Sequence, residues 1–371
     1  MAENFQIRDI FNPQRVNQLA GSLKSVWPSF DSVSFSENII PRLPNLSFSE
    51  RSQLITDMLA QHLPDDFPTA IDILMKSLPG KIEKQEIEGY DGFIIMPISI
   101  YVSHYGMEHF ELSMNALYEM TQRFTAEFAI RFFIEKYPER TLSVLSEWAT
   151  DPNPHVRRLV SEGTRPLLPW ALRLKRFVED PTPTLPLLDL LKNDPELFVR
   201  RSVANHLNDH AKNHPDLVVE MLKHWKSEHS SKELDWLVKH ATRTLVKNGH
   251  PGALELIGFK KGAEVEIENF NTTPQVAMGG YLNFSFNLVS TGKKAQKLVI
   301  DYVIYFKKAG GSLAPKVFKM TTKSLAPGER LSLQKRHSFR EITTRVYYPG
   351  EHAVAVQVNG VEVGKVGFVL K

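Results

Sequence analysis

The sequence contains no cysteine among its 371 residues. Disulfide bonds, thiolate metal sites and cysteine nucleophiles are therefore excluded, and a reducing, cytoplasmic environment is expected. No stretch approaches the roughly 18 consecutive apolar residues that a membrane-spanning helix requires. The N-terminal segment MAENFQIRDIF also lacks the basic and then apolar layout of a secretory signal. We therefore expect a cytoplasmic protein without a membrane segment.

Several familiar catalytic motifs are also missing. No GxSxG nucleophile turn, Walker phosphate loop or glycine-rich dinucleotide-binding turn occurs. His206, His210 and His214 share one helical face and are candidates for binding a metal. No carboxylate or cysteine partner completes a catalytic metal pattern, however, and packed or solvated histidines are more common than metal ligands. We therefore expect neither a metal nor a cofactor.

The residues that are present describe an ordinary globular chain, with 42% apolar and 23% charged residues. At roughly 150 residues per domain, the length predicts two or three domains. The net charge of +3 hides an uneven distribution: residues 1–119 carry 8 basic and 16 acidic side chains, residues 120–262 carry 22 and 18, and residues 263–371 carry 15 and 8. A polyanion would therefore meet only part of the chain, unless the domains differ in charge by chance.

The first two thirds of the sequence predict stacked helices. Apolar residues recur at three- and four-residue spacing from about Glu3 to Phe259. The octapeptide DPNPHVRR at residues 151–158 recurs 43 residues later as DPELFVRR at residues 194–201. This interval lies within the ~40–47 residue period of two-helix HEAT or armadillo repeats. We therefore expect an all-α domain of HEAT-like helical repeats over residues 1–262.

The last third predicts an all-β domain. Its segments alternate apolar and polar residues, are rich in β-branched and aromatic residues, and are separated by turns such as Asn359-Gly360. The predicted strands cover residues 264–270, 281–290, 298–307, 316–322, 330–340, 352–358 and 361–370. Seven short strands in about 100 residues are typical of an immunoglobulin-like β-sandwich. We assign this domain to residues 263–371.

Basic and acidic residues alternate on one face of three predicted helices. These faces hold Arg123, Glu127 and Arg131; Arg158, Glu162 and Arg165; and Arg201, Asn205 and Asp209. In stacked helical pairs, equivalent faces line up into one concave surface. The arginines suit a groove that binds phosphates. A carboxylate in such a groove repels DNA, so its presence indicates that something cationic must be met there.

Simpler interpretations of the same residues remain open. Pairs of arginine and glutamate four residues apart stabilise exposed helices by ~0.2–0.5 kcal/mol and are common. Tryptophans such as Trp148 and Trp170 lie in a core more often than at a ligand. In the β domain, the clusters Lys293–Lys297, Lys307–Lys308 and Lys335–Arg340 form either a rim that contacts phosphates or a solvated edge that prevents sheet pairing.

Three segments resemble a known family. They are DPNPHVRRLVSEGTRPLLPW at residues 151–170, FTAEFAIRFF at residues 124–133 and VRRSVANHLNDHAKNHP at residues 199–215. They are similar to AlkC, of the AlkC/AlkD superfamily of HEAT-like alkylbase DNA glycosylases. One AlkC subgroup carries a C-terminal immunoglobulin-like domain, which agrees with the predicted β domain.

The resemblance implies a monofunctional glycosylase of base excision repair. Its partner would be double-stranded DNA that contains alkylated bases, and it would excise cationic bases, chiefly N3-methyladenine and N3-methylcytosine, without flipping them into a pocket. The matching positions imply Glu127, Glu162 and Asp209 as catalytic residues and Arg158, Arg165 and Trp170 as DNA-binding residues. To the DNA-binding residues we add Arg157 and Arg201 from the repeated Val-Arg-Arg. We expect a monomer in the bacterial cytoplasm, associated with the nucleoid.

The expected chemistry agrees with these residue types. N3 alkylation makes the base a cationic leaving group, and cleavage of the glycosidic bond builds positive charge on the deoxyribose. Carboxylates directed at that charge would stabilise it, and one of them would orient or deprotonate the attacking water. The alternative function is a non-catalytic HEAT-repeat scaffold that binds nucleic acid or protein, because most helical repeat arrays are binding modules.

Overall fold

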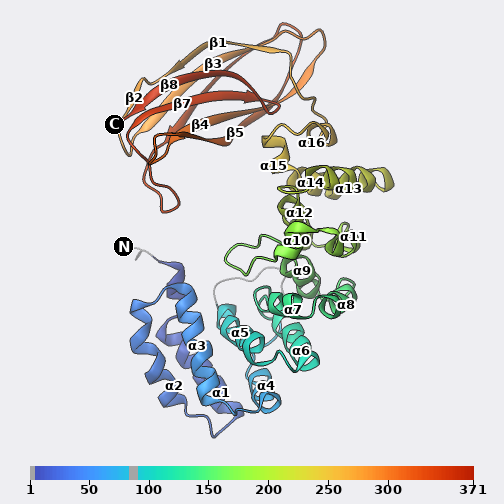
Figure 1. The fold of residues 1–371 in the computed structure, drawn as a ribbon, viewed down its shortest axis with the longest axis vertical. Helices are drawn as coiled ribbons and strands as arrows, with labels where there is room; N and C mark the ends of the chain where they lie inside the picture. Colours follow the sequence, from blue (N-terminus) through green and yellow to red (C-terminus); the bar gives the residue numbers. More distant parts are fainter. Residues whose placement is uncertain (1–4, 83–90) are drawn as a thin grey trace. The chain divides into compact units, whose positions relative to one another are not determined.

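The computed structural model of the chain describes residues 5–82 and 91–371. It divides into two compact units, residues 1–213 and residues 214–371. The first unit is helical, and the second combines helices with two β-sheets (Figure 1). The predicted order of an all-α region followed by a β domain of two sheets is confirmed.

The first unit consists of short helices that begin at clear capping signals. Ser47 and Glu50 form a capping box at α3, and the side chain of Asn153 caps α9. The helices are η1 (Ile7–Ile10), α1 (Pro13–Val26), α2 (Ser32–Ile39), η2 (Ile40–Asn45), α3 (Phe48–His62), α4 (Phe67–Lys76), η3 (Asp91–Ile94), α5 (Ile95–Tyr105), α6 (Phe110–Thr121), α7 (Ile130–Lys136), α8 (Pro138–Trp148), α9 (Pro154–Gly163), α10 (Lys175–Glu179), η4 (Thr182–Thr184), α11 (Leu185–Leu191) and α12 (Leu197–His210).

The repeated octapeptide forms the same local structure twice. It joins α8 to α9 in the first copy and α11 to α12 in the second, and α9 packs against α12. The Asp151 carboxylate accepts a hydrogen bond from the backbone N–H of Asn153 at 2.7 Å, and the Asp194 carboxylate accepts one from the backbone N–H of Glu196 at 2.9 Å. Each aspartate thus closes the turn that starts the second helix of its pair, as the repeat predicts.

The second unit begins with helices and continues into the sandwich. Its helices are α13 (Pro215–Glu228), α14 (Lys232–Ala241), α15 (Arg243–Lys247) and α16 (Pro251–Leu256). Its strands are β1 (Val265–Thr272), β2 (Gln275–Val276), β3 (Tyr281–Ser290), β4 (Gln296–Lys307), β5 (Leu313–Leu325), β6 (Arg330–Ser338), β7 (Gly350–Val358) and β8 (Val361–Leu370). They form a three-stranded sheet, β1-β3-β6, and a five-stranded sheet, β2-β8-β7-β4-β5.

All seven predicted strands are present, and the sequence analysis missed only the two-residue β2, which pairs in parallel with β8. The side chains buried between the sheets include Phe286, Ile300, Phe339 and Val356. Neighbouring strands pair antiparallel apart from β2 and β8. In β3 the core follows from the alternation of inward apolar and outward polar residues, whereas β4 and β7 are buried on both faces over most of their length.

The hairpin between β7 and β8 joins the sandwich to the helices of its own unit. The Asn359 side chain donates a hydrogen bond to the carbonyl oxygen of Lys260 at 2.7 Å. The Gln357 side chain donates one to the carbonyl oxygen of Lys247 at 2.6 Å. The change from helix to strand lies near residue 263, but because of such contacts the compact unit already begins at residue 214.

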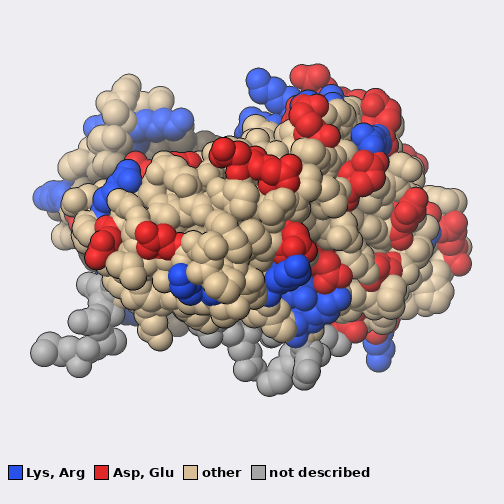
Figure 2. Space-filling model, turned by 90° about the horizontal axis from the view of Figure 1, so that it is seen from below, with Lys and Arg blue, Asp and Glu red and all other residues tan. Residues whose placement is uncertain are grey.

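Charge is distributed unevenly on the surface. Figure 2 shows one face of the molecule, on which acidic side chains are scattered among uncharged ones and basic side chains form smaller groups. Among residues 5–82 and 91–371, no helix combines the length and the apolar character that crossing a membrane requires.

Substitution of Gly360 by alanine tests the contact of the β7–β8 hairpin with the helices of the second unit. Gly360 has a φ of +78°, and a Cβ atom there would lie 1.9 Å from the Cα atom of Gly249. Gly328 is a matched control, because its φ is +73° and a Cβ atom there meets nothing within 4 Å. We expect Gly328→Ala to lower the free energy of unfolding by about 1 kcal/mol. Gly360→Ala should cost about 1–3 kcal/mol more, because the backbones must separate. Urea unfolding of both variants measures this difference, and equal losses would contradict it.

Candidate functional site

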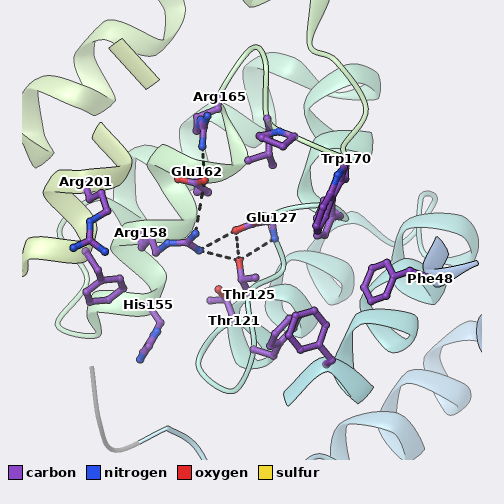
Figure 3. A pocket seen from close by; sticks show the side chains of 16 residues that line it. Phe48, Thr121, Thr125, Glu127, His155, Arg158, Glu162, Arg165, Trp170 and Arg201 are labelled. Carbon is purple, nitrogen blue, oxygen red and sulfur yellow. Dashed lines mark hydrogen bonds and ion pairs between the residues drawn. The ribbon is translucent and has the colours of Figure 1, made fainter. Parts of the chain in front are cut away.

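A pocket opens on the first unit where α6, α9 and α12 approach the N-terminal helices. Its cavity volume is about 580 Å³. It is lined by Phe48, Phe93, Thr121, Phe124, Thr125, Glu127, Phe128, His155, Arg158, Glu162, Arg165, Leu168, Pro169, Trp170, Phe198 and Arg201. Figure 3 shows Phe48 and Trp170 on one side of the carboxylates, and Arg201 and His155 on the other.

The polar wall of the pocket starts at Glu127, in the loop between α6 and α7. The Thr125 hydroxyl donates to Glu127 Oε2 at 2.9 Å, and Thr125 Oγ1 accepts from the Glu127 amide. Arg158 Nη1 donates to the same Oε2 at 2.9 Å. Arg158 Nη2 lies 3.7 Å from Glu162 Oε1, one helical turn along α9. Arg158 therefore stands between two carboxylates, as the spacing of the two residues on α9 predicts.

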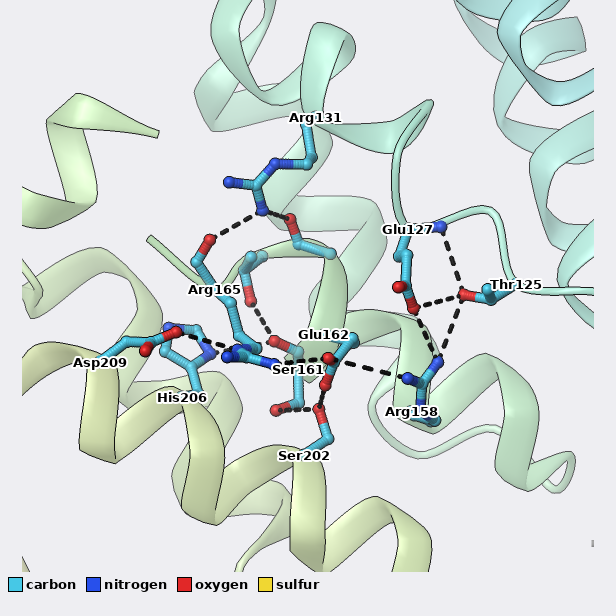
Figure 4. Close-up of polar contacts among 12 residues, drawn as sticks. Thr125, Glu127, Arg131, Arg158, Ser161, Glu162, Arg165, Ser202, His206 and Asp209 are labelled. Atoms are coloured by element: carbon cyan, nitrogen blue, oxygen red, sulfur yellow. Dashed lines mark hydrogen bonds and ion pairs between the residues drawn. The ribbon is translucent and has the colours of Figure 1, made fainter. Parts of the chain in front are cut away.

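The same series continues toward α12 (Figure 4). Arg165 Nη1 donates to Glu162 Oε1 at 2.7 Å, and Arg165 Nε donates to Asp209 Oδ2 at 2.9 Å. Lys212 Nζ donates to Asp209 Oδ1 at 3.1 Å. We call this series the charged row; its members are Glu127, Arg158, Glu162, Arg165, Asp209 and Lys212, in which acids and cations alternate.

Burial differs along the charged row. The exposed fractions are 13% for the Glu127 side chain and 26% for that of Arg158, against 8% for Glu162 and 4% for Asp209. Burial raises the pKa of Glu162, but the charges of Arg158 and Arg165 outweigh it, so this pKa lies below its usual range. Burial lowers the pKa of Arg158, but Glu127 and Glu162 outweigh it and raise this pKa. Both groups are therefore ionised at neutral pH.

Of the three carboxylates in the charged row, Glu127 is the one with an oxygen that no donor contacts. Within the described parts of the chain, its Oε1 atom has no hydrogen-bond partner, since Thr125 and Arg158 both contact Oε2. Both oxygens of Glu162 are contacted, and so are both oxygens of Asp209. Glu127 therefore offers the pocket a free carboxylate oxygen. Asp209 is not part of the pocket lining, and its carboxylate contacts Arg165.

Arg131, which the sequence places on the same face as Glu127, is fully buried and lies outside the pocket. Its guanidinium donates to the carbonyl oxygens of Gly163 at 2.9 Å, Arg165 at 2.7 Å and Leu172 at 2.6 Å. Burial lowers the pKa of Arg131 to about 10, so it stays charged. Arg131 thus ties together the end of α9 and the loop that follows.

Trp170 lies in that loop and is 78% exposed, so the interpretation as a core residue is wrong for it. Its φ of +63° is in the left-handed region, which costs a non-glycine residue about 1–2 kcal/mol. Its ring centroid lies 6.3 Å from that of Phe48. A strained and exposed tryptophan at the edge of a pocket is suited to contact a ligand. Phe48 had no signal in the sequence, because it comes from the distant α3.

The two adjacent arginines of each repeat have different roles. Arg157 pairs with Asp194 at 2.5 Å and donates to the carbonyl oxygens of Asp151 and Pro152. Arg200, its equivalent 43 residues later, donates in the same way to the carbonyl of Pro195 at 2.8 Å. The second arginines, Arg158 and Arg201, line the pocket, whereas Arg157 does not. Arg201 is exposed and has no partner among the described residues.

The histidines do not assemble a metal site. His206 and His210 are buried, with ring centroids 4.7 Å apart. No group of three histidine, cysteine or acidic side chains suited to a metal occurs in the part of the chain that the structure describes. Sequence reasoning also missed Thr125 and Ser202, which contact the carboxylates; the short Thr-x-Glu spacing of residues 125–127 is the signal that would have found Thr125.

Replacing Arg157 by alanine tests the structural role of the first arginine. It would leave Asp194, which is 6% exposed, without its cation. Removing one partner of a buried pair typically costs about 3–5 kcal/mol of unfolding free energy. Arg201→Ala is the control and should change stability by no more than about 0.5 kcal/mol, because Arg201 is exposed. Urea unfolding compares the two variants. Similar losses in both would contradict the assignment.

The comparisons with known proteins cover both units. A family model described as a DNA alkylation repair enzyme matches residues 121–245, which include the charged row. A model described as the C-terminal Ig-like domain of the uncharacterised protein YhaZ matches residues 266–371. The YhaZ protein of Bacillus subtilis (strain 168) is 36% identical over 356 residues, covering 95% of this chain and 96% of YhaZ.

A solved structure is similar over the whole length. It is the Pseudomonas fluorescens alkylpurine DNA glycosylase AlkC bound to DNA containing an abasic site analog. It is 38% identical, has a TM-score of 0.91, and the match covers 99% of this chain and 100% of that one. The chain therefore belongs to the AlkC family, in the group whose HEAT-like helical region is followed by a C-terminal immunoglobulin-like domain.

Proposed function

We propose that the protein is a monofunctional DNA glycosylase of base excision repair. Its substrates are N3-methyladenine and N3-methylcytosine in double-stranded DNA, and it hydrolyses the N-glycosidic bond without flipping the base. The observation that carries this proposal is the Oε1 atom of Glu127, which has no hydrogen-bond partner among the described residues and belongs to the end of the charged row that lines the pocket. The similar AlkC protein is an alkylpurine DNA glycosylase bound to DNA, which supports the substrate class.

The carboxylates stabilise positive charge that develops on the deoxyribose. Because N3 alkylation makes the base a cationic leaving group, the reaction needs little general acid, and its transition state resembles an oxocarbenium ion. Glu127 faces this charge directly and orients the attacking water through Oε1. Glu162 acts at longer range, since arginines and a serine occupy its oxygens. Asp209 is the third carboxylate and holds Arg165 in place.

The cations and Trp170 hold the duplex. Arg158, with 26% of its side chain exposed, and the exposed Arg201 contact phosphates beside the lesion. Arg165 is more buried and supports the DNA contact through Glu162. Trp170 packs on the sugar or on an adjacent base. Arg157 belongs to the repeat turn and contributes to DNA binding only by keeping α9 folded.

The β domain adds a second contact with DNA. Residues 263–371 carry 15 basic and 8 acidic side chains, which favours a polyanionic partner. A polar groove of about 620 Å³ crosses the β1-β3-β6 sheet and includes Lys335 and Arg336. We assign this groove to phosphate contact. The protein works as a monomer in the bacterial cytoplasm, at the nucleoid.

Replacing Glu127 or Glu162 by glutamine tests the catalytic role. Each substitution keeps the side-chain shape and removes the negative charge, so we expect base release to slow by about 10²–10³ while DNA binding is kept or improved. The measurement is single-turnover release of bases from methylated duplex DNA. Glu147→Gln, on the exposed face of α8, is the matched control and should keep the wild-type rate. Rates within a few-fold of wild type for both pocket variants would contradict the assignment. Tight DNA binding without base release by the wild type would favour the scaffold.

The salt dependence of DNA binding tests the phosphate contacts. Each lost phosphate contact lowers the slope of log K against log salt by about one. Arg201→Ala should therefore reduce the slope by about one, and a variant with both Lys335→Ala and Arg336→Ala should reduce it by about two. Lys76→Ala, exposed on α4 and outside the pocket, is the control and should leave the slope unchanged. An unaltered slope for Arg201→Ala would place that side chain away from the DNA backbone.

A further inference from the structure

Glu162 is held by two different elements, one at each oxygen. Arg165 Nη1 lies 2.7 Å from Oε1; Glu162 lies in the last turn of α9, and Arg165 comes two residues after that helix ends. The Ser202 hydroxyl lies 2.5 Å from Oε2 and belongs to α12, in the second copy of the repeat (Figure 4). The contact of Ser202 with Glu162 therefore joins the two repeats at the carboxylate itself.

The direction of this hydrogen bond follows from counting protons. Ser202 Oγ has one proton and two neighbours, Glu162 Oε2 at 2.5 Å and Ser161 Oγ at 3.0 Å. An ionised carboxylate only accepts, so the Ser202 proton must point to Glu162. Ser202 Oγ then accepts a hydrogen bond from the Ser161 hydroxyl. Ser161 is fully buried and Ser202 is 2% exposed, so water does not compete for these bonds.

A second contact fixes Ser202 one helical turn further along α12. His206 Nδ1 lies 3.0 Å from the carbonyl oxygen of Ser161. Because the carbonyl accepts, Nδ1 carries the ring proton. Burial, with the nearby His210 and Arg165, lowers the pKa of His206 well below its usual value, so the ring stays neutral beside the arginine. The position of Ser202 against Glu162 is thus set by two hydrogen bonds between α9 and α12.

We propose that Ser202 is a positioning residue for base excision: its hydroxyl, oriented by Ser161, holds the Glu162 carboxylate between Arg158 and Arg165. This inference rests on the proposed glycosylase function. Ser202 does not line the pocket, so it acts through Glu162 and touches neither the base nor the sugar.

The consequence of losing the hydroxyl can be distinguished from a loss of packing. Without it, Oε2 of a buried, charged carboxylate has no donor, which disfavours the ionised form. The pKa of Glu162, which the serine helps to lower, then rises. Catalysis that needs ionised Glu162 must then fail at a higher pH as the solution is acidified. A serine with only a packing role would leave this pH dependence unchanged.

The experiment measures single-turnover base release from methylated duplex DNA from about pH 3.5 to pH 8 with full-length protein, because the pKa of Glu162 lies below its usual 4.5. For Ser202→Ala we expect a roughly tenfold lower rate at neutral pH and an acid limb that moves up by about one pH unit. Ser202→Thr keeps the hydroxyl and should retain most of the wild-type rate and the wild-type position of the acid limb. Ser161→Ala should move the limb in the same direction by less. The matched control is Ser99→Ala, because Ser99 is 2% exposed and donates only to the carbonyl oxygen of Met96.

Two results would overturn the proposal: a Ser202→Ala profile that superimposes on wild type, or an equal shift in Ser99→Ala. A carboxyl-carbon NMR titration of Glu162 in the DNA-free protein makes the inference separable from the glycosylase function. A higher Glu162 pKa in Ser202→Ala supports the hold on the carboxylate even where wild type releases no base, in which case only the proposed function fails. An unchanged Glu162 pKa in Ser202→Ala overturns the inference about Ser202. If Ser202→Ala does not fold, an unchanged Glu162 pKa in Ser161→Ala overturns the proposal.

Discussion

The alternation of charge from Glu127 to Lys212 is the constraint on which the rest of the site depends. Removing a single ion from water costs several kcal/mol, and a buried carboxylate or guanidinium is tolerated only beside its counter-charge. In this row each buried acid lies next to cations: Arg158 and Arg165 keep Glu162 ionised at 6% exposure, and Arg165 and Lys212 contact Asp209 at 3% exposure. Removing any member takes away part of the counter-charge of its neighbours. The row is consequently rigid, and rigid charges are what electrostatic stabilisation of a transition state requires, because they need not reorganise as charge develops.

The HEAT-like repeat provides the backbone positions for this row. Its acids come from a loop, from α9 and from α12, which are separated in sequence but stacked in space. Asp151 and Asp194 start the helices at equivalent places, so that equivalent faces align. Arg131 then closes the arrangement by holding the carbonyl groups that end α9. The strained backbone of Trp170 lies in the loop anchored in this way, and the fold can maintain that strain because the surrounding contacts are buried.

Helical periodicity correctly placed Arg158 and Glu162 on one face of α9. It was wrong for Arg123, Glu127 and Arg131, because α6 ends at Thr121 and α7 begins at Ile130, so that Glu127 lies in the loop between them. It placed Arg158, Glu162 and Arg165 together, and the structure does bring them into one pocket. It could not separate Arg157 from Arg158, since neighbours in sequence differ by only 100° around a helix, and their partners lie on other elements. The same limit applies to Asp209, whose carboxylate reaches Arg165 and not the pocket. Contacts such as that of Phe48 with Trp170 depend on how distant helices pack, which no local pattern contains.

The two ends of the charged row differ in a way that relates the fold to the proposed chemistry. At one end Lys212 is 44% exposed, so its charge is solvated and needs no further partner. At the other end is an acid, Glu127, which lines the pocket and has one oxygen without a hydrogen-bond partner in the described structure. The next member of an alternating series after an acid is a cation. An alkylated base, and then the oxocarbenium-like sugar, would supply that cation. The transition state would thus extend the alternation of acids and cations in the charged row. A neutral base would bring no such charge before bond cleavage begins, which gives a physical reason why a site of this kind would select cationic lesions.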